Sequence, residues 1–88
     1  MKIKPGFILR DIDNQTIVIP VGTTAAKFNG MITLRGTGKF LWELLNEEQT
    51  EESLLQAVLA NYDVAEAIAA SDIKSFLGSL REAELLSE

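Results

Sequence analysis

The sequence predicts an α+β fold in which a three-stranded antiparallel sheet is followed by three helices. Before about residue 35, the apolar residues come in short runs that are rich in β-forming types and bounded by turn residues. After that point they recur at the three- and four-residue spacing of a helix. With 88 residues the chain has room for one small core, so residues 1–88 are expected to form a single domain.

A β-hairpin is expected near the start of the chain. Its strands are the segments GFILRDI, residues 6–12, and TIVIPV, residues 16–21. Asp13, Asn14 and Gln15 lie between the two segments and are typical of a tight turn. Alternation divides the side chains of the second strand into two faces, Ile17, Ile19 and Val21 on one and Thr16, Val18 and Pro20 on the other.

The third strand is expected in the segment MITL, residues 31–34, after the long connection VGTTAAKFNG. Ile32 and Leu34 point to one side of the sheet, and Met31 and Thr33 point to the other. A short strand after a long connection is expected at the edge of a sheet, where unpaired N–H and C=O groups can accept an additional strand. The alternative is that the strand is merely short, which by itself protects an edge from pairing.

The first helix is predicted from two apolar pairs that lie four residues apart. These are Phe40 with Leu41 and Leu44 with Leu45, and Trp42 widens the apolar face.

The second helix is predicted to begin after Thr50, which is a suitable N-cap residue. Glu51 and Glu52 then lie in its first turn, where carboxylates complement the helix dipole. Its apolar positions, spaced as one helical face, are Leu55, Val58, Leu59 and Tyr62.

The last helix is predicted to begin with Asp63 as its N-cap. Its apolar positions repeat the same spacing and are Ile73, Phe76, Leu77 and Leu80.

The stretch Gly36-Thr37-Gly38-Lys39 looks at first like a phosphate-binding loop. A Walker A loop requires G-x-x-x-x-G-K followed by Ser or Thr, whereas Thr33 occupies the first glycine position and Phe40 follows the lysine. A dinucleotide-binding fingerprint would also require a later strand, and none is predicted. We therefore interpret Gly36 and Gly38 as residues that relieve strain where a strand turns into a helix.

The composition excludes several kinds of chemistry. The chain has no cysteine and no histidine, so it offers no thiolate, no disulfide and no imidazole base or ligand. Its carboxylates are spread along helices instead of being paired in apolar surroundings, which is the pattern of solvated faces. No catalytic residue, metal ion or cofactor is therefore predicted, and the protein is not expected to be an enzyme.

Charge and hydropathy set expectations for location and partners. The formal net charge of −5 argues against general nucleic-acid binding, because neutralisation of phosphates supplies most of that affinity. The first residues include charges and no apolar signal-peptide core, and no apolar run is long enough for a membrane span. A cytoplasmic protein that binds neither nucleic acid nor membrane is expected.

One stripe of the last helix differs from its apolar face. It consists of small side chains and two cations, namely Ala67, Ala70, Ser71, Lys74, Gly78 and Arg81. A glycine inside a helix costs about 1 kcal/mol relative to alanine, so Gly78 calls for an explanation. One interpretation is a groove wall that another backbone approaches, with Leu77 as its floor. The other is an ordinary solvent-exposed face.

The sequence resembles the PqqD-like family, named for coenzyme PQQ synthesis protein D. The resemblance rests on KPGFILRDI, IVIP, FNGMITLRGTGKFLWELL, TEESLL and DIKSFLGSLREAELL, which together cover nearly the whole chain. It implies a small winged-helix-like domain that acts as a peptide-binding chaperone, or RiPP recognition element. Such a domain holds the leader of a ribosomally made precursor peptide and presents it to a modifying enzyme, often a radical SAM protein.

The resemblance also implies a binding site. In the family the leader adds as a strand to the third β-strand, in the cleft against the last helix. Carried over to this sequence, the peptide-binding residues are Asn29, Met31, Ile32, Thr33, Leu34, Lys74, Leu77, Gly78 and Arg81. The chain ends with AELLSE and lacks the tryptophan common near the end of PQQ-pathway members, which favours a different precursor peptide.

Two alternatives belong to other functional classes. A winged-helix regulator that binds DNA would share the architecture, but its last helix should be basic, and here Lys74 and Arg81 stand among several acids. A structural domain that self-associates through an open sheet edge is the second alternative. A homodimer of this kind is also compatible with peptide binding.

Overall fold

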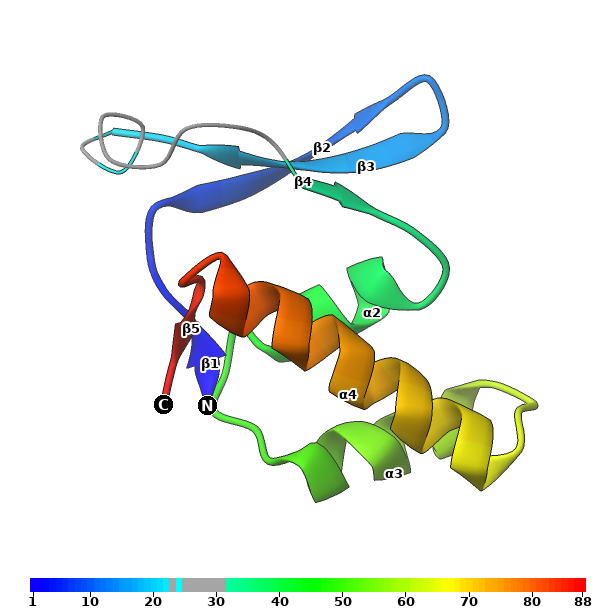
Figure 1. Cartoon of the computed structure of the whole chain (residues 1–88). Helices are drawn as coiled ribbons and strands as arrows, with labels where there is room; N and C mark the ends of the chain where they lie inside the picture. The colour runs from blue at the N-terminus through cyan, green and yellow to red at the C-terminus, as the bar shows by residue number, and fades with distance from the viewer. Residues whose placement is uncertain (23, 25–31) are drawn as a thin grey trace. The chain divides into compact units, whose positions relative to one another are not determined.

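The computed structural model describes residues 1–22, 24 and 32–88 (Figure 1). The elements in chain order are β1 (Lys2–Ile3), β2 (Phe7–Ile12), β3 (Gln15–Pro20), β4 (Ile32–Leu34), α2 (Gly38–Leu44), α3 (Glu51–Asn61), α4 (Glu66–Glu82) and β5 (Leu86–Ser87). The strands β2, β3 and β4 form an antiparallel sheet in that order. The predicted α+β class, a three-stranded antiparallel sheet followed by three helices, is confirmed.

The chain divides into two compact units. The sheet unit is the continuous segment Lys4–Phe40, and the helical unit combines Met1–Ile3 with Leu41–Glu88.

The hairpin of the sheet unit has a two-residue turn. β2 and β3 pair along their whole length, from Phe7 opposite Pro20 to Ile12 opposite Gln15. Asp13 and Asn14 therefore form the turn, and both have a positive φ, 49° and 64°. Positive φ at both central residues is what a type I′ turn requires, and Asp and Asn tolerate it better than most residues. The predicted hairpin is confirmed, although Gln15 belongs to β3 and not to the turn.

The sheet has two faces of different character. One face, which we call the Val18 face, includes Leu9, Val18, Ile32 and Leu34, and Val18 is completely buried. The other, the Ile8 face, carries the alternate residues of the same strands, Ile8, Arg10, Ile12, Ile17, Ile19 and Thr33. The alternation predicted for the second strand is thus confirmed, and the buried side is the one that contains Val18.

The strand-to-helix corner after β4 depends on one glycine. Gly36 has a φ of 56°, a conformation that residues with a Cβ adopt at a cost. The chain then turns tightly, because the Gly38 N–H donates a hydrogen bond of 2.9 Å to the Arg35 carbonyl. The interpretation of this stretch as a corner is confirmed for Gly36, while Gly38 is the first residue of α2.

Asp11 connects both strands of the hairpin to the start of α2 within the sheet unit. The Thr16 hydroxyl donates to Asp11 Oδ1 at 2.7 Å, and Lys39 Nζ donates to Oδ2 at 3.3 Å. These contacts lower the pKa of Asp11, with the Thr16 hydrogen bond contributing most and the Lys39 hydrogen bond and charge next.

In the helical unit, α3 begins as predicted. Thr50 is the N-cap, and its Oγ1 accepts a hydrogen bond of 3.0 Å from the Ser53 N–H. Ser53 reciprocates, because its Oγ accepts the Thr50 N–H at 2.9 Å, which completes a capping box. Glu51 and Glu52 lie in the first turn.

The buried face of α3 is rotated relative to the predicted one. Leu54 and Val58 are its buried residues, whereas Leu55 and Leu59 are only half-buried. The adjacent apolar pairs Leu54–Leu55 and Val58–Leu59 offer two overlapping apolar stripes, and the stripe through Leu54 is the one that packs. Tyr62 is the C-cap in extended conformation, so it leaves the helical path and is 42 % exposed.

The prediction that Asp63 caps the last helix is wrong. The N-cap of α4 is Ala65, which makes no capping hydrogen bond through its side chain. The preference of Asp for N-cap positions locates a helix start only to within a few residues, and it does not determine at which residue the helical backbone begins. The apolar face is confirmed for Ile73, Leu77 and Leu80, which are buried together with Ala69, while Phe76 is half-buried.

The sequence did not predict the two-residue strands β1 and β5. They pair antiparallel, with Lys2 opposite Ser87 and Ile3 opposite Leu86, so the first and last residues of the helical unit lie side by side (Figure 1). Ile3 is buried, and its N–H donates a hydrogen bond of 2.8 Å to the Leu45 carbonyl. Strands of two residues are too short to show an alternating pattern.

We predict that Thr16→Val raises the pKa of Asp11, because it removes the larger of the two hydrogen bonds that favour the carboxylate. Lys39→Met should also raise this pKa, because it removes the second hydrogen bond together with the Lys39 charge. NMR titration of the Asp11 carboxyl carbon measures both effects. Because the pKa is depressed in the folded chain, the associated stability is present above the unfolded pKa and is lost as pH falls through the folded one. An unchanged pKa in both variants would contradict this account.

Candidate functional site

The open edge of β4 is the first part of the candidate site. In the part of the chain that the structure describes, β4 pairs with β3 and with no other strand. One side of β4 therefore carries main-chain N–H and C=O groups that are not used within the sheet, which is the condition for accepting an additional strand.

The hairpin turn determines which residues of β3 bond to which neighbour. A two-residue turn makes its closing pair, Ile12 and Gln15, a hydrogen-bonded pair, and every second pair along the ladder is then of the same kind. Ile17 therefore directs its main-chain groups to β2. Thr16 and Val18 direct theirs to β4.

Thr33 is consequently the residue of β4 that offers its main chain to an incoming strand. It lies opposite Ile17, whose main-chain groups point to β2, so this pair is not hydrogen-bonded. The N–H and C=O of Thr33 point away from β3, and its side chain is exposed. Ile32 and Leu34 bond to β3 instead.

The other predicted residues of the strand segment differ in accessibility. Ile32 is half-buried and Leu34 is buried, both on the Val18 face, so the side chain of Leu34 belongs to the core. Asn29 and Met31 lie outside the described residues.

The stripe predicted on α4 is the second part of the candidate site, and it belongs to the helical unit. Lys74 is exposed and Leu77 is completely buried. Gly78 is half-buried, and among the described residues a Cβ added to it would have no heavy atom within 4 Å outside its own helical turn. The packing of the described residues therefore does not require a glycine at this position.

Arg81 is already engaged with the end of the chain. Its Nε and Nη2 donate to Glu88 Oε1 at 3.1 and 3.0 Å. These hydrogen bonds are the main reason that the pKa of Arg81 is raised, and the charges of Glu88 and Glu51 add to the effect. Of the two predicted cations, Lys74 is the one that makes no ion pair with the described residues.

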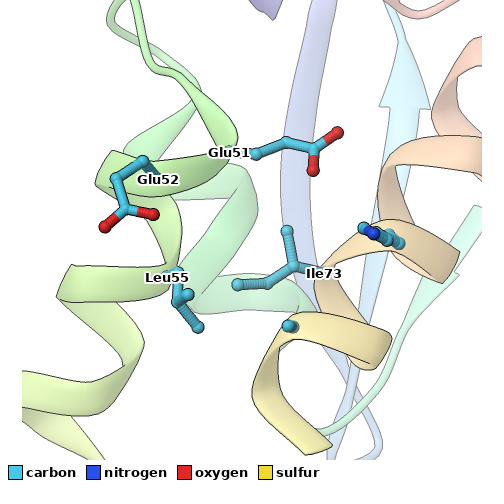
Figure 2. A pocket seen from close by; sticks show the side chains of 6 residues that line it. Glu51, Glu52, Leu55 and Ile73 are labelled. Atoms are coloured by element: carbon cyan, nitrogen blue, oxygen red, sulfur yellow. The ribbon is translucent and has the colours of Figure 1, made fainter. Parts of the chain in front are cut away.

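A small cavity lies beside Lys74 (Figure 2). Its volume is about 160 Å³, and its lining consists of Glu51, Glu52, Leu55, Ala70, Ile73 and Lys74. Leu55 and Ile73 face each other from α3 and α4, and the Glu51 side chain points from α3 toward α4 (Figure 2). The volume fits a single side chain and is below the several hundred Å³ of a typical cofactor pocket.

Other kinds of site find no support in the described residues. Among them no polar or charged side chain is buried, and no three or more carboxylates lie close enough together to hold a metal ion. Within the same ranges no helix is both long and apolar enough to cross a membrane.

Comparison with known protein families shows to which family the chain belongs. The family described as Coenzyme PQQ synthesis protein D (PqqD) matches residues 8–86. The chain belongs to the PqqD family. This confirms the resemblance seen in the sequence, and the matched range begins within β2 and ends within β5, so it leaves out β1, Phe7 and Ser87.

A solved structure is also similar to this PqqD-family chain. It is described as TbiB1 in Complex with the TbiA(beta) Leader Peptide, and the two chains are 28 % identical with a TM-score of 0.74. The alignment covers 99 % of this chain and 95 % of the other. No curated protein sequence matches the chain.

We predict that Gly78→Ala raises the free energy of unfolding by up to about 1 kcal/mol, because alanine has the higher helix propensity and its Cβ has open space here. Urea denaturation of the free protein measures the change. Ala67→Gly, in the exposed first turn of the same helix, is the control and should lower the free energy of unfolding, by less than a substitution in the helix interior would. Destabilisation by Gly78→Ala would contradict the open surroundings of Gly78.

Proposed function

We propose that this protein is a non-catalytic adaptor that binds the leader of a ribosomally synthesised precursor peptide. The leader adds as a fourth strand to the free edge of β4. The observation that carries the proposal is the open main chain of Thr33 in a PqqD-family chain that is similar to a protein solved with a leader peptide.

Strand addition explains how such a protein can hold a peptide without a deep pocket. Main-chain hydrogen bonds supply affinity that depends little on sequence, and contacts to alternate side chains supply specificity. Ile32 and Leu34 bond to β3 and hold the strand in place, so that Thr33 is presented in extended conformation at the edge. The neighbouring positions Asn29 and Met31 extend the proposed site along the same segment.

The α4 stripe is proposed to supply the side-chain contacts. Gly78 leaves room for a peptide backbone, and Lys74 has its ammonium group available for an acidic residue of the leader. Leu77 supports this surface from the core, because its own side chain is buried. Arg81 would contact the leader only by exchanging its bond to Glu88, so we assign it a minor role.

The bound leader is presented to a second partner, a peptide-modifying enzyme such as a radical SAM protein. The adaptor itself contributes no catalytic residue to this reaction. We place the complex in the cytoplasm, where precursor peptides are made. The precursor is proposed to be one other than that of PQQ.

The first test is a titration of the protein with its cognate leader, taken from a short reading frame next to its gene. We expect amide chemical-shift changes in residues 32–34 and 74–81. Unmoved amides in both segments at saturating leader would contradict the assigned site.

The second test removes one hydrogen-bond donor from the edge. Thr33→Pro eliminates the outward N–H without breaking a bond to β3, and proline is tolerated on edge strands. Loss of one such bond should weaken leader binding by about tenfold, as measured by calorimetry. Unchanged affinity in a folded variant would contradict strand addition at this residue.

A third variant tests the α4 stripe. Gly78→Phe should weaken leader binding because its ring occupies the space proposed for the peptide backbone. The free energy of unfolding should be nearly unaffected, since the position is open in the free protein. Ser79→Phe, at an exposed position about 100° around the same helix from Gly78, is the control and should bind the leader normally. Equal affinities for all three chains would exclude the stripe from the site.

A further inference from the structure

The sheet has a second open edge, formed by β2. In the described part of the chain, the six residues of β2 pair with β3 and with no other strand. This edge is twice as long as the three-residue edge of β4. A long edge strand without a cover is a template for pairing with another chain.

The alternation of hydrogen-bonded and non-hydrogen-bonded pairs that leaves the main chain of Thr33 open also leaves the main chain of every second residue of β2 open. Ile8, Arg10 and Ile12 direct their main-chain groups to β3, because they belong to the hydrogen-bonded pairs of the hairpin. The main-chain groups of Leu9 and Asp11 therefore point to the open edge.

The side chains at this edge are unusually apolar for a solvent-facing position. Ile8 is 37 % exposed and Ile12 is 48 % exposed, and both lie on the Ile8 face. Exposed Arg10 lies midway between them on the same face. The pattern along the edge is thus isoleucine, arginine, isoleucine, and it is symmetric about Arg10.

We propose that two copies of this chain pair through β2 to form a dimer with a continuous six-stranded sheet. The strands run antiparallel about a two-fold axis at Arg10. A two-fold interface must be complementary to itself, and the symmetric pattern meets this condition. Ile8 of each copy then lies opposite Ile12 of the other, and Leu9 and Asp11 exchange main-chain hydrogen bonds across the axis.

Arg10 should make this association weak and dependent on concentration. In this register the two arginines lie directly opposite each other, and like charges in that position destabilise a strand pair. Burial of four isoleucine side chains and the new main-chain hydrogen bonds act in the opposite direction.

The dimer has a consequence for leader binding, and this consequence rests on the proposed function. Pairing through β2 leaves β4 at both outer edges of the six-stranded sheet. Each copy therefore keeps its own edge for a leader, and the dimer binds two leaders at once. Pairing through β4 would instead compete with the leader.

Cysteine crosslinking tests the register, because the chain contains no cysteine of its own. Residues that face each other in a non-hydrogen-bonded antiparallel pair have Cα atoms about 4.5 Å apart, which is within the range of a disulfide. Under mild oxidation with oxidised glutathione, Arg10→Cys should give a covalent species of twice the chain mass of 9.7 kDa.

The controls are cysteine variants at other exposed positions. Ile8→Cys should stay monomeric because its own copy lies several residues away, whereas the double variant I8C/I12C should crosslink. Ile68→Cys, on α4 and 56 % exposed, controls for random collision. Crosslinking of Arg10→Cys no faster than that of Ile8→Cys or Ile68→Cys would overturn the proposal.

Crosslinking in the presence and absence of leader tests the dimer independently of the proposed function. The dimer crosslinked through Arg10→Cys should bind two leaders, and leader should not slow its formation. Suppression of crosslinking by leader would overturn pairing through β2. Crosslinking in the predicted pattern with no leader binding would leave the dimer established and contradict the proposed function.

Discussion

The two-residue turn at Asp13 and Asn14 is the constraint on which the functional surfaces depend. Its positive φ angles fix Ile12 opposite Gln15, and this pair sets the parity of every later pair in the sheet. A slip of one residue would move Val18 from the buried face to the other face. It would also turn the main chain of Thr33 toward β3 and the main chains of Ile32 and Leu34 outward, so other residues would face an incoming strand. A local backbone preference thus determines both which side chains are buried and which main-chain groups remain open.

Much of the fold follows from the sequence because the relevant signals are local. The hairpin, the Thr50 cap and the apolar face of α4 each depend on residues a few positions apart. The sequence-based predictions fail where the local pattern fits two alternatives equally well or where no local pattern exists. Asp63 is a good cap residue in the wrong place, and Leu54 competes with Leu55 for the buried face of α3. The strands β1 and β5 could not be predicted, because each is two residues long and its partner lies at the other end of the sequence.

The candidate site was predictable in outline but not in its details. The sequence indicated an edge strand and a small-residue stripe, and the family resemblance joined them into one site. Pairing register was needed to identify Thr33 as the residue with outward main-chain groups. Side-chain geometry was needed to distinguish Lys74, which is available, from Arg81, which is bonded to Glu88. The apolar edge of β2 was missed, since exposure of Ile8 and Ile12 depends on the sheet order and not on the sequence pattern alone.

Hydrogen exchange at the three amides of β4 tests the central claim most directly. In the free protein, the amides of Ile32 and Leu34 should exchange slowly because they bond to β3, and the Thr33 amide should exchange fast. Saturating leader should slow exchange at Thr33 by a large factor and change the other two much less. A Thr33 amide that is already protected in the free protein, or that stays fast with leader bound, would contradict leader binding by strand addition to β4.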